Sequence, residues 1–311
     1  MLPLTSDALL NVLRDIASRH CPAHTDMLPS AGTPERSGLI NAVQHVFDLP
    51  DAGLLTDASI TLEEWAVALS ERASVRRLHL FDTISTGAFS HQLQRPQVHE
   101  ADTLMQEVNT LKALLDTPPI ANRTLVSWLP LQTVSGFMLG ALLPQEAGFK
   151  TRSLFDHANA LWELNAGDMV VTSSDRWRQL AERLPALPAN ITAVSTEPLD
   201  APTCHALLAN GVARVVELYG TPSTGMLAVR TSHEAPFELL THWHPTESDD
   251  VLLQLPANGV PREVALAEPL HWVGARHFEL DPLPKAPLAD AMQALFERPG
   301  QFVPEEGASA A

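Results

Sequence analysis

The chain has 311 residues, is 45% hydrophobic and carries a formal net charge of −17. A surface this acidic repels phosphate backbones, which argues against a general nucleic-acid binder, and no apolar run is long enough for a membrane span. Two cysteines, Cys21 and Cys204, are too few for a disulfide framework. Because the N-terminus also lacks the basic region of a signal peptide, we expect a cytoplasmic protein.

Helical periodicity dominates the N-terminal region, residues 1–77. Apolar residues recur at helical spacing within 5–20 and 37–47, which is typical of amphipathic helices. Thr61 and Glu64 have the spacing of a capping box, so a third helix is expected to begin there. Short helices joined by long connections predict a small helical bundle.

In the next region, residues 78–230, predicted strands alternate with predicted helices. This alternation is typical of an α/β fold, in which a mainly parallel sheet is flanked by helices. The expected strands are 77–83, 123–130, 167–174, 190–196 and 213–220, and the expected helices are 101–115, 134–144, 176–184 and 200–211.

The C-terminal part, residues 231–300, is predicted to be a short β-rich subdomain with a final helix. Segments broken by proline and glycine predict strands at 237–244, 249–256 and 271–280, and 288–298 has a helical pattern. Residues 301–311 lack an apolar anchor, so a disordered tail is expected.

The stretch "VVELYGTPSTGMLAVR", residues 215–230, indicates a buried strand, a turn and a second apolar segment. Loops of this composition often face a ligand. It is one of five segments that, in order, resemble the large domain of the acyl-adenylating (AMP-forming) superfamily, which includes acyl-CoA synthetases and 4-coumarate–CoA ligases. The other four are "FDTISTGAFS" (81–90), "LMQEVNTLKALL" (104–115), "VSWLPLQTVSGFMLGALLP" (126–144) and "GDMVVTSSDRW…NITAVSTEPLD" (167–200).

The resemblance implies a ligand cleft that accepts an acyl or aryl acid and a nucleotide. "STG" at 85–87 is similar to the family's phosphate loop, and "YGTPSTG" at 219–225 is similar to its Y-G-x-T-E-x-G motif. ATP or AMP and Mg²⁺ are the cofactors that it implies. The nucleotide- or acyl-binding candidates are Ser85, Thr86, Gly87, Ser195, Thr196, Tyr219, Gly220, Thr221, Ser223, Thr224 and Gly225.

Several residues depart from the family pattern. Ser223 stands where the family has the glutamate that helps to hold Mg²⁺, Ser90 replaces the loop lysine, and Ile84 and Thr196 each replace a glycine. A bound triphosphate needs a bridging cation and a cradle of backbone N–H groups. The segment at 275–296 also lacks the family's hinge signature, and no lysine-bearing C-terminal domain follows it. We therefore expect a truncated, degenerate synthetase with weak or no ligase activity, and we assign no catalytic residue.

The N-terminal helices distantly resemble an acyl carrier protein. Ser37 would then be the phosphopantetheine site, although a helix N-cap is the alternative role for this serine. An acyl carrier protein or another biosynthetic enzyme is a candidate partner, and a small carboxylic acid or acyl group is a candidate ligand. Two other functions stay open: a non-catalytic interaction subunit, and an enzyme that reuses the pocket for altered chemistry.

Other polar residues have simpler interpretations. Arg230 is expected to form a structural ion pair, and Cys204 is expected to be a small core residue. His242 and His244 would share one face of a strand, but two ligands do not make a metal site, so no metal site is assigned.

Overall fold

The structure is a computed structural model, and it describes residues 2–20, 26–50, 53, 55, 59–73, 75–81, 96–115, 122–155, 159–183, 186–188, 190–221, 224–266 and 269–280. Several predictions fall outside these residues: the phosphate-loop candidates Ser85, Thr86 and Gly87, the hairpin residue Ser223, the helix at 288–298 and the tail at 301–311.

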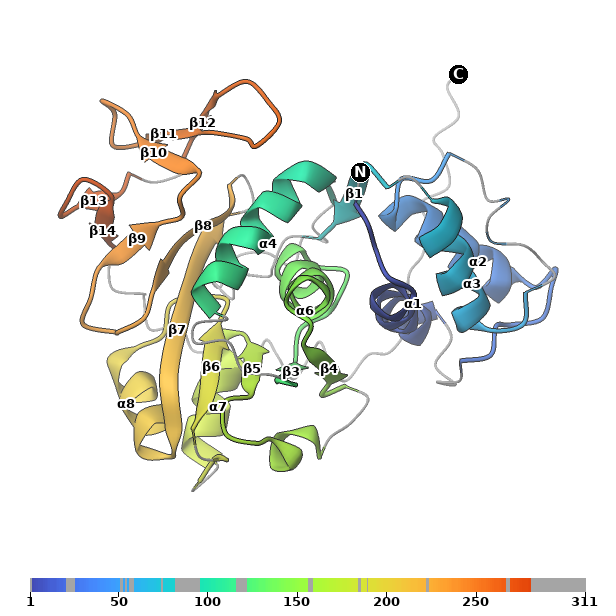
Figure 1. Cartoon of the computed structure of the whole chain (residues 1–311), viewed down its shortest axis with the longest axis horizontal. Helices are drawn as coiled ribbons and strands as arrows, with labels where there is room; N and C mark the ends of the chain where they lie inside the picture. The colour runs from blue at the N-terminus through green and yellow to red at the C-terminus, as the bar shows by residue number, and fades with distance from the viewer. Residues whose placement is uncertain are drawn as a thin grey trace, which may run out of the picture.

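A nine-stranded mixed sheet organises the described chain, in the order β13-β14-β9-β8-β7-β6-β5-β3-β4 (Figure 1). The predicted α/β class is confirmed, and the parallel pairing is confined to one half of the sheet. That half contains β4 (Lys150–Ser153), β3 (Thr124–Ser127), β5 (Met169–Thr172), β6 (Ile191–Ser195) and β7 (Val212–Thr221). The antiparallel half contains β8 (Gly225–Arg230), β9 (Phe237–Leu239), β14 (His277–Glu279) and β13 (His271–Trp272).

Helices cover both faces of the parallel half. Neighbouring side chains on each strand point to opposite faces, so each strand contributes to a hydrophobic cluster on either side of the sheet. On β5, Val171 belongs to one hydrophobic cluster and Val170 to the other. The first cluster includes α4 (Ala101–Leu115), α5 (Val134–Phe137), the π-helical turn η2 (Met138–Leu142) and α6 (Leu143–Ala147). The second includes the 3₁₀ helix η3 (Ala160–Glu163), α7 (Ser174–Arg183) and α8 (Ala201–Ala209).

The N-terminal helices α1 (Ser6–His20), α2 (Pro34–Val46) and α3 (Leu62–Arg72) pack beyond α4 and α6, on the right of Figure 1. Their apolar stripes join the same cluster as α4, so the bundle is continuous with the core. The predicted capping box at Thr61 and Glu64 is confirmed.

The start of α2 corrects one prediction. Its N-cap is Thr33, whose Oγ1 accepts a hydrogen bond from Arg36 N, and Pro34 is the first helical residue. Proline favours this position because its fixed φ suits a helix and its missing N–H would be unpaired there. Ser37 therefore lies inside the helix, exposed, and its Oγ donates to Thr33 O at 3.2 Å. The N-cap role for Ser37 is wrong.

Two smaller sheets complete the fold. One pairs β1 (Arg77–Leu80) with β2 (Gln97–Glu100), and the other orders β10 (Trp243–Pro245), β11 (Val251–Gln254) and β12 (Arg262–Ala265). The predicted strand at 237–244 is in fact two strands in different sheets, β9 and β10, with His242 in the turn before β10. His242 and His244 therefore do not lie on one strand.

Helix α4 connects the outer three-stranded sheet to the core. The Gln106 side chain donates to Leu255 O at 2.8 Å and accepts from Ala257 N at 2.9 Å. Within the described part of the chain, no helix has both the length and the apolar character needed to cross a membrane.

Candidate functional site

The carboxyl ends of the parallel strands bring two of the predicted loops together. Thr172 of β5 is in register with Ser195 of β6, which is in register with Glu217 of β7. Strand β7 continues past this row to Thr221, so its hairpin with β8 projects beside the loop that follows β6. In α/β sheets this edge is where ligands usually bind.

Ser195 ends β6 and Thr196 begins the loop that follows, and both residues are buried. The Ser195 hydroxyl closes its own turn, because its Oγ donates to Glu197 O at 2.6 Å. Thr196 N donates to Thr172 O at 3.1 Å, which fixes the backbone, but its Oγ1 has no hydrogen-bond partner among the described residues. Thr196, rather than Ser195, therefore offers a polar group at this edge.

Acidic residues near this loop were not among the predicted site residues. The Glu197 carboxyl group accepts from Ser174 Oγ at 2.6 Å, and its pKa is raised by burial and by the neighbouring Asp175. Asp175 in turn accepts from Arg178 at 2.8 Å. The available signal was the position of these acids directly after predicted strands, where parallel sheets expose their carboxyl ends.

The β7–β8 hairpin depends on two glycines. A Cβ on Gly220 would lie 2.0 Å from Gly225 O, and Gly225 has a φ of +69°, which disfavours other residues. The Thr224 hydroxyl donates to Gly225 O at 3.0 Å, and Thr221 pairs with Gly225 at the end of the ladder. These predicted site residues thus shape the turn itself.

Tyr219 faces an aromatic cluster. Its ring centroid lies 5.8 Å from those of Phe237 and Phe278. The tyrosine is half-buried, so these contacts anchor the root of the hairpin to β9 and β14.

A buried acid from α4 supports the tip of the hairpin. Glu107 Oε2 accepts from Met226 N at 3.0 Å, and a Cβ on Gly225 would lie 2.8 Å from Glu107 Oε1. Burial raises the pKa of Glu107 to about 8. This carboxyl group was absent from the predicted site.

A second buried acid, Glu217, supports the loop after β6. Its two carboxylate oxygens accept from Arg230 Nε at 2.8 Å and Arg230 Nη2 at 2.7 Å, and Oε2 also accepts from Leu199 N at 2.7 Å. The predicted structural ion pair of Arg230 is therefore confirmed, and its partner is Glu217.

Cys204, Glu217 and His233 place their potential ligand atoms within 4.8 Å of one another. The Arg230 guanidinium already neutralises Glu217, and its Nη2 lies 3.0 Å from His233 Nδ1. Burial raises the pKa of the Cys204 thiol to about 12, which disfavours the thiolate that a metal would need. The group therefore fits a structural network, and Cys204 is the core residue that the sequence predicts.

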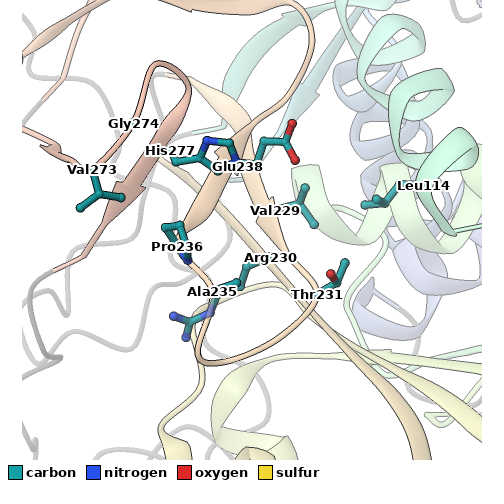
Figure 2. A pocket seen from close by; sticks show the side chains of 10 residues that line it. All are labelled: Leu114, Val229, Arg230, Thr231, Ala235, Pro236, Glu238, Val273, Gly274 and His277. Atoms are coloured by element: carbon teal, nitrogen blue, oxygen red, sulfur yellow. The ribbon is translucent and has the colours of Figure 1, made fainter.

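A separate cleft of about 480 Å³ lies at the far end of β8 (Figure 2). Leu114 lies on one side of it, and Val229, Arg230, Glu238 and His277 contribute to the rest of its lining. None of the ligand-binding candidates within the described residues lines this cleft, so we place the candidate site at the loop after β6 and the β7–β8 hairpin.

The sheet and its flanking helices match the fold of a solved acyl-CoA synthetase-like structure. The protein shares this fold with an acyl-CoA synthetase (AMP-forming)/AMP-acid ligase II-like protein from Dyadobacter fermentans, with a TM-score of 0.53, 14% identity and coverage of 69% of this chain and 62% of that chain. A scan of family models gave no match.

Sequence comparison finds curated relatives that are 4-coumarate–CoA ligases. The chain is 26% identical over 253 residues to a 4-coumarate–CoA ligase of Rhodobacter capsulatus, covering 79% of this chain and 64% of the relative. It is 28% identical over 185 residues to the Halorhodospira halophila 4-coumarate–CoA ligase, covering 59% and 46%. The aligned part thus spans less than two thirds of either relative. The predicted resemblance to the adenylate-forming superfamily is confirmed.

Proposed function

We propose that this chain is an AMP-forming acyl- or aryl-CoA, or acyl-carrier, synthetase-like protein that keeps a ligand cleft and has weak or no ligase activity. The observation that carries the proposal is that the Thr196 loop and the Gly220–Gly225 hairpin follow the neighbouring strands β6 and β7 at the carboxyl edge. These are two of the loops through which the sequence resembles the superfamily.

The polar groups at this edge suit a nucleotide monophosphate or an acyl ligand. The Thr196 hydroxyl is buried and has no partner within the described residues, and a buried hydroxyl gains about 1–3 kcal/mol when a partner satisfies it. The hairpin contributes backbone groups and the Thr224 hydroxyl rather than carboxylates.

Two departures from the family pattern, Ser223 and Ser90, account for the weak adenylation that we propose. Mg²⁺ prefers charged oxygen ligands, and Ser223 offers a neutral hydroxyl at the position where the family has an acid. Ser90 likewise supplies no positive charge to the phosphates. Removal of one such preorganised contact typically lowers the rate by about 10²–10³.

Binding and catalysis can be tested separately. We expect AMP to raise the melting temperature of the purified chain, and Thr196→Val to weaken AMP binding about tenfold in calorimetry. Thr192→Val, which lies within β6 and before the edge, is the matched control and should bind as the wild type does. ATP–pyrophosphate exchange should stay near background with aromatic acids. Robust exchange would refute the degenerate assignment, and the absence of any AMP effect would refute the cleft.

A non-catalytic interaction subunit is the second candidate function. Met27 and Ile60 are 55% and 58% exposed, and their two segments are joined by the Met27–Thr61 bridge and by a hydrogen bond from Leu28 N to Ile60 O. Exposed apolar residues on the helical region suit a partner such as an acyl carrier protein or a biosynthetic enzyme. Co-purification of one such partner, lost in a Met27→Ser, Ile60→Ser variant, would favour this function over ligand binding.

A further inference from the structure

Arg176 is a half-buried cation in the first turn of α7, close to the carboxyl end of β5. Its guanidinium carbon lies 4.5 Å from the centroid of the Trp128 ring and 5.2 Å from that of the Phe155 ring. Such cation–π contacts hold a guanidinium in place, but the rings supply no carboxylate and no lone-pair acceptor for its N–H groups. The side chain is therefore positioned without being neutralised.

The contacts of Arg176 leave most of its donors unused. Within the described residues, its hydrogen bond runs from Nη1 to Trp128 O, and no acid there forms an ion pair with it. Burial lowers the pKa of Arg176 to about 10, so the group is still charged at neutral pH. On the same helix, Arg178 pairs with Asp175 at 2.8 Å and with Asp200 at 3.3 Å. The lack of a counter-ion thus distinguishes Arg176 from its neighbour.

The composition of the chain makes this arrangement unusual. Acidic residues outnumber lysine and arginine by 37 to 20, yet two aromatic rings, rather than a carboxylate, contact Arg176. A partly buried charge without a counter-ion costs stability. A bound anion would supply the charge that the described part of the protein does not.

The Arg176 stack, defined as Arg176, Trp128 and Phe155, is connected to the candidate site through β5. Trp128 O also accepts from Thr172 Oγ1 at 3.4 Å, and Thr172 O accepts from Thr196 N at 3.1 Å. Thr172 therefore links the stack to the loop after β6. Phe155 is 49% exposed, so the stack is open to solvent.

We propose that Arg176 binds an oxyanion: its remaining N–H donors take a carboxylate or phosphate group of a ligand that enters from solvent at the carboxyl end of β5. Both groups match the planar fork of a guanidinium, which can donate two parallel hydrogen bonds to either of them. The binding of an oxyanion rests on the contacts of Arg176 alone. Its assignment to the same ligand as the Thr196 loop rests on the proposed function.

Two anionic probes and their neutral counterparts test the proposal on the full chain. Calorimetry compares AMP with adenosine, for a phosphate, and benzoate with benzamide, for a carboxylate. The proteins are the wild type, Arg176→Gln, Arg176→Lys and Arg183→Gln. Arg183 is exposed in the last turn of the same helix, so its variant is the matched control.

We expect one anionic probe to bind the wild type and Arg183→Gln about tenfold or more tightly than its neutral counterpart does, because the hydrogen bonds to a guanidinium are charge-assisted. Arg176→Gln should remove this difference and leave the affinity for the neutral probe unchanged, and Arg176→Lys should keep part of it. The pair that shows the difference identifies the source of the oxyanion. Equal affinities of Arg176→Gln and the wild type for both anionic probes, or no difference within either pair in the wild type, overturn the proposal.

Arginine modification gives a test that needs no variant. Phenylglyoxal should label Arg176 in the wild type, and the anionic probe should slow this labelling without slowing that of Arg183, as measured by peptide mass spectrometry. Unchanged labelling of Arg176 in the presence of either probe contradicts the proposal.

The two proposals can fail separately. If benzoate binding depends on Arg176 but AMP does not bind, the proposed nucleotide cleft fails and the oxyanion site stands. If AMP binding depends on Thr196 and neither probe depends on Arg176, the oxyanion site fails and the proposed function stands.

Discussion

The two loops of the candidate site are held by buried glutamates in different electrostatic settings. Glu217 is 1% exposed and Glu107 is 2% exposed, and each accepts a hydrogen bond from a backbone N–H of its loop. Glu217 also has a bidentate arginine, whereas the arginine that acts on Glu107, Arg262, is hydrogen-bonded to Gln254. The comparison shows that a buried carboxyl group can anchor a loop with or without a bidentate arginine.

The origin of the difference lies in the position of each acid. Arg230 and Glu217 are direct cross-strand partners on β7 and β8, so the ladder itself brings the charges together. Glu107 projects from a helix that packs on apolar side chains, so it has no cross-strand partner that could be a cation.

Removal of the cation from Glu217 should produce the largest effect. We expect Arg230→Met to lower the free energy of unfolding by about 3–5 kcal/mol, because it leaves a buried carboxylate unpaired. Arg152→Met, which breaks the exposed ion pair with Glu163, is the control and should cost less than about 1 kcal/mol. Urea denaturation measures both, and similar losses in the two variants would contradict a special role for the buried pair.

A third buried titratable group, His242, extends the comparison to acidic pH. Both of its ring nitrogens lack partners within the described residues, and burial lowers its pKa to about 4. The unfolded chain, with a pKa near 6.5, binds a proton that the folded chain excludes, so stability should fall by about 2–3 kcal/mol between pH 6.5 and 4. His242→Phe should reduce this slope in denaturation experiments, whereas the exposed His205→Gln should leave it unchanged.

A substitution in the turn that contacts Glu107 should have a smaller effect on stability. Gly225→Ala should cost about 1–3 kcal/mol, because alanine is strained at a φ of +69° and its Cβ would meet the Glu107 carboxyl group. Gly38 in α2 has open space around it, so Gly38→Ala should stabilise the protein by about 0.5–1 kcal/mol. Thermal denaturation measures both variants. A change in stability of the same sign in both would argue against the described geometry of the turn.

Thiol reactivity gives the subtlest test of the Glu217 anchor. In a Cys21→Ser background, Cys204 should react with a disulfide reagent at pH 8 only as fast as the protein opens, since burial raises its pKa to about 12. Arg230→Met should accelerate the reaction. Rapid labelling of the folded parent would mean that the network around Glu217 is open to solvent.

The fold could be predicted from the sequence wherever burial determines the pattern. Segments such as "MVVT" and "ITAVS" are apolar enough to be predicted as strands, and α4 has its predicted bounds. The strands "QVHE", "KTRS" and "REVA" were not predicted, because they are short and largely polar. Their pairing depends on tertiary partners, which no local pattern reveals.

The candidate site could be predicted only in part, for a related reason. Chain order located the Thr196 loop and the Gly225 turn, but the support from Glu107 joins residues far apart in the sequence. One signal was available: Glu107 interrupts an apolar helical stripe between Leu104 and Leu111, and an acid on a buried face usually has a specific partner.

The adjacency of Gln106 and Glu107 has a mechanical consequence. Within one turn of α4, Gln106 is hydrogen-bonded to the segment that follows β11 of the outer sheet, and Glu107 is hydrogen-bonded to the hairpin. A rotation of the helix about its axis, or a slide of less than one turn, would disturb both attachments together. The outer sheet and the hairpin therefore cannot shift independently while this turn of α4 keeps its hydrogen bonds.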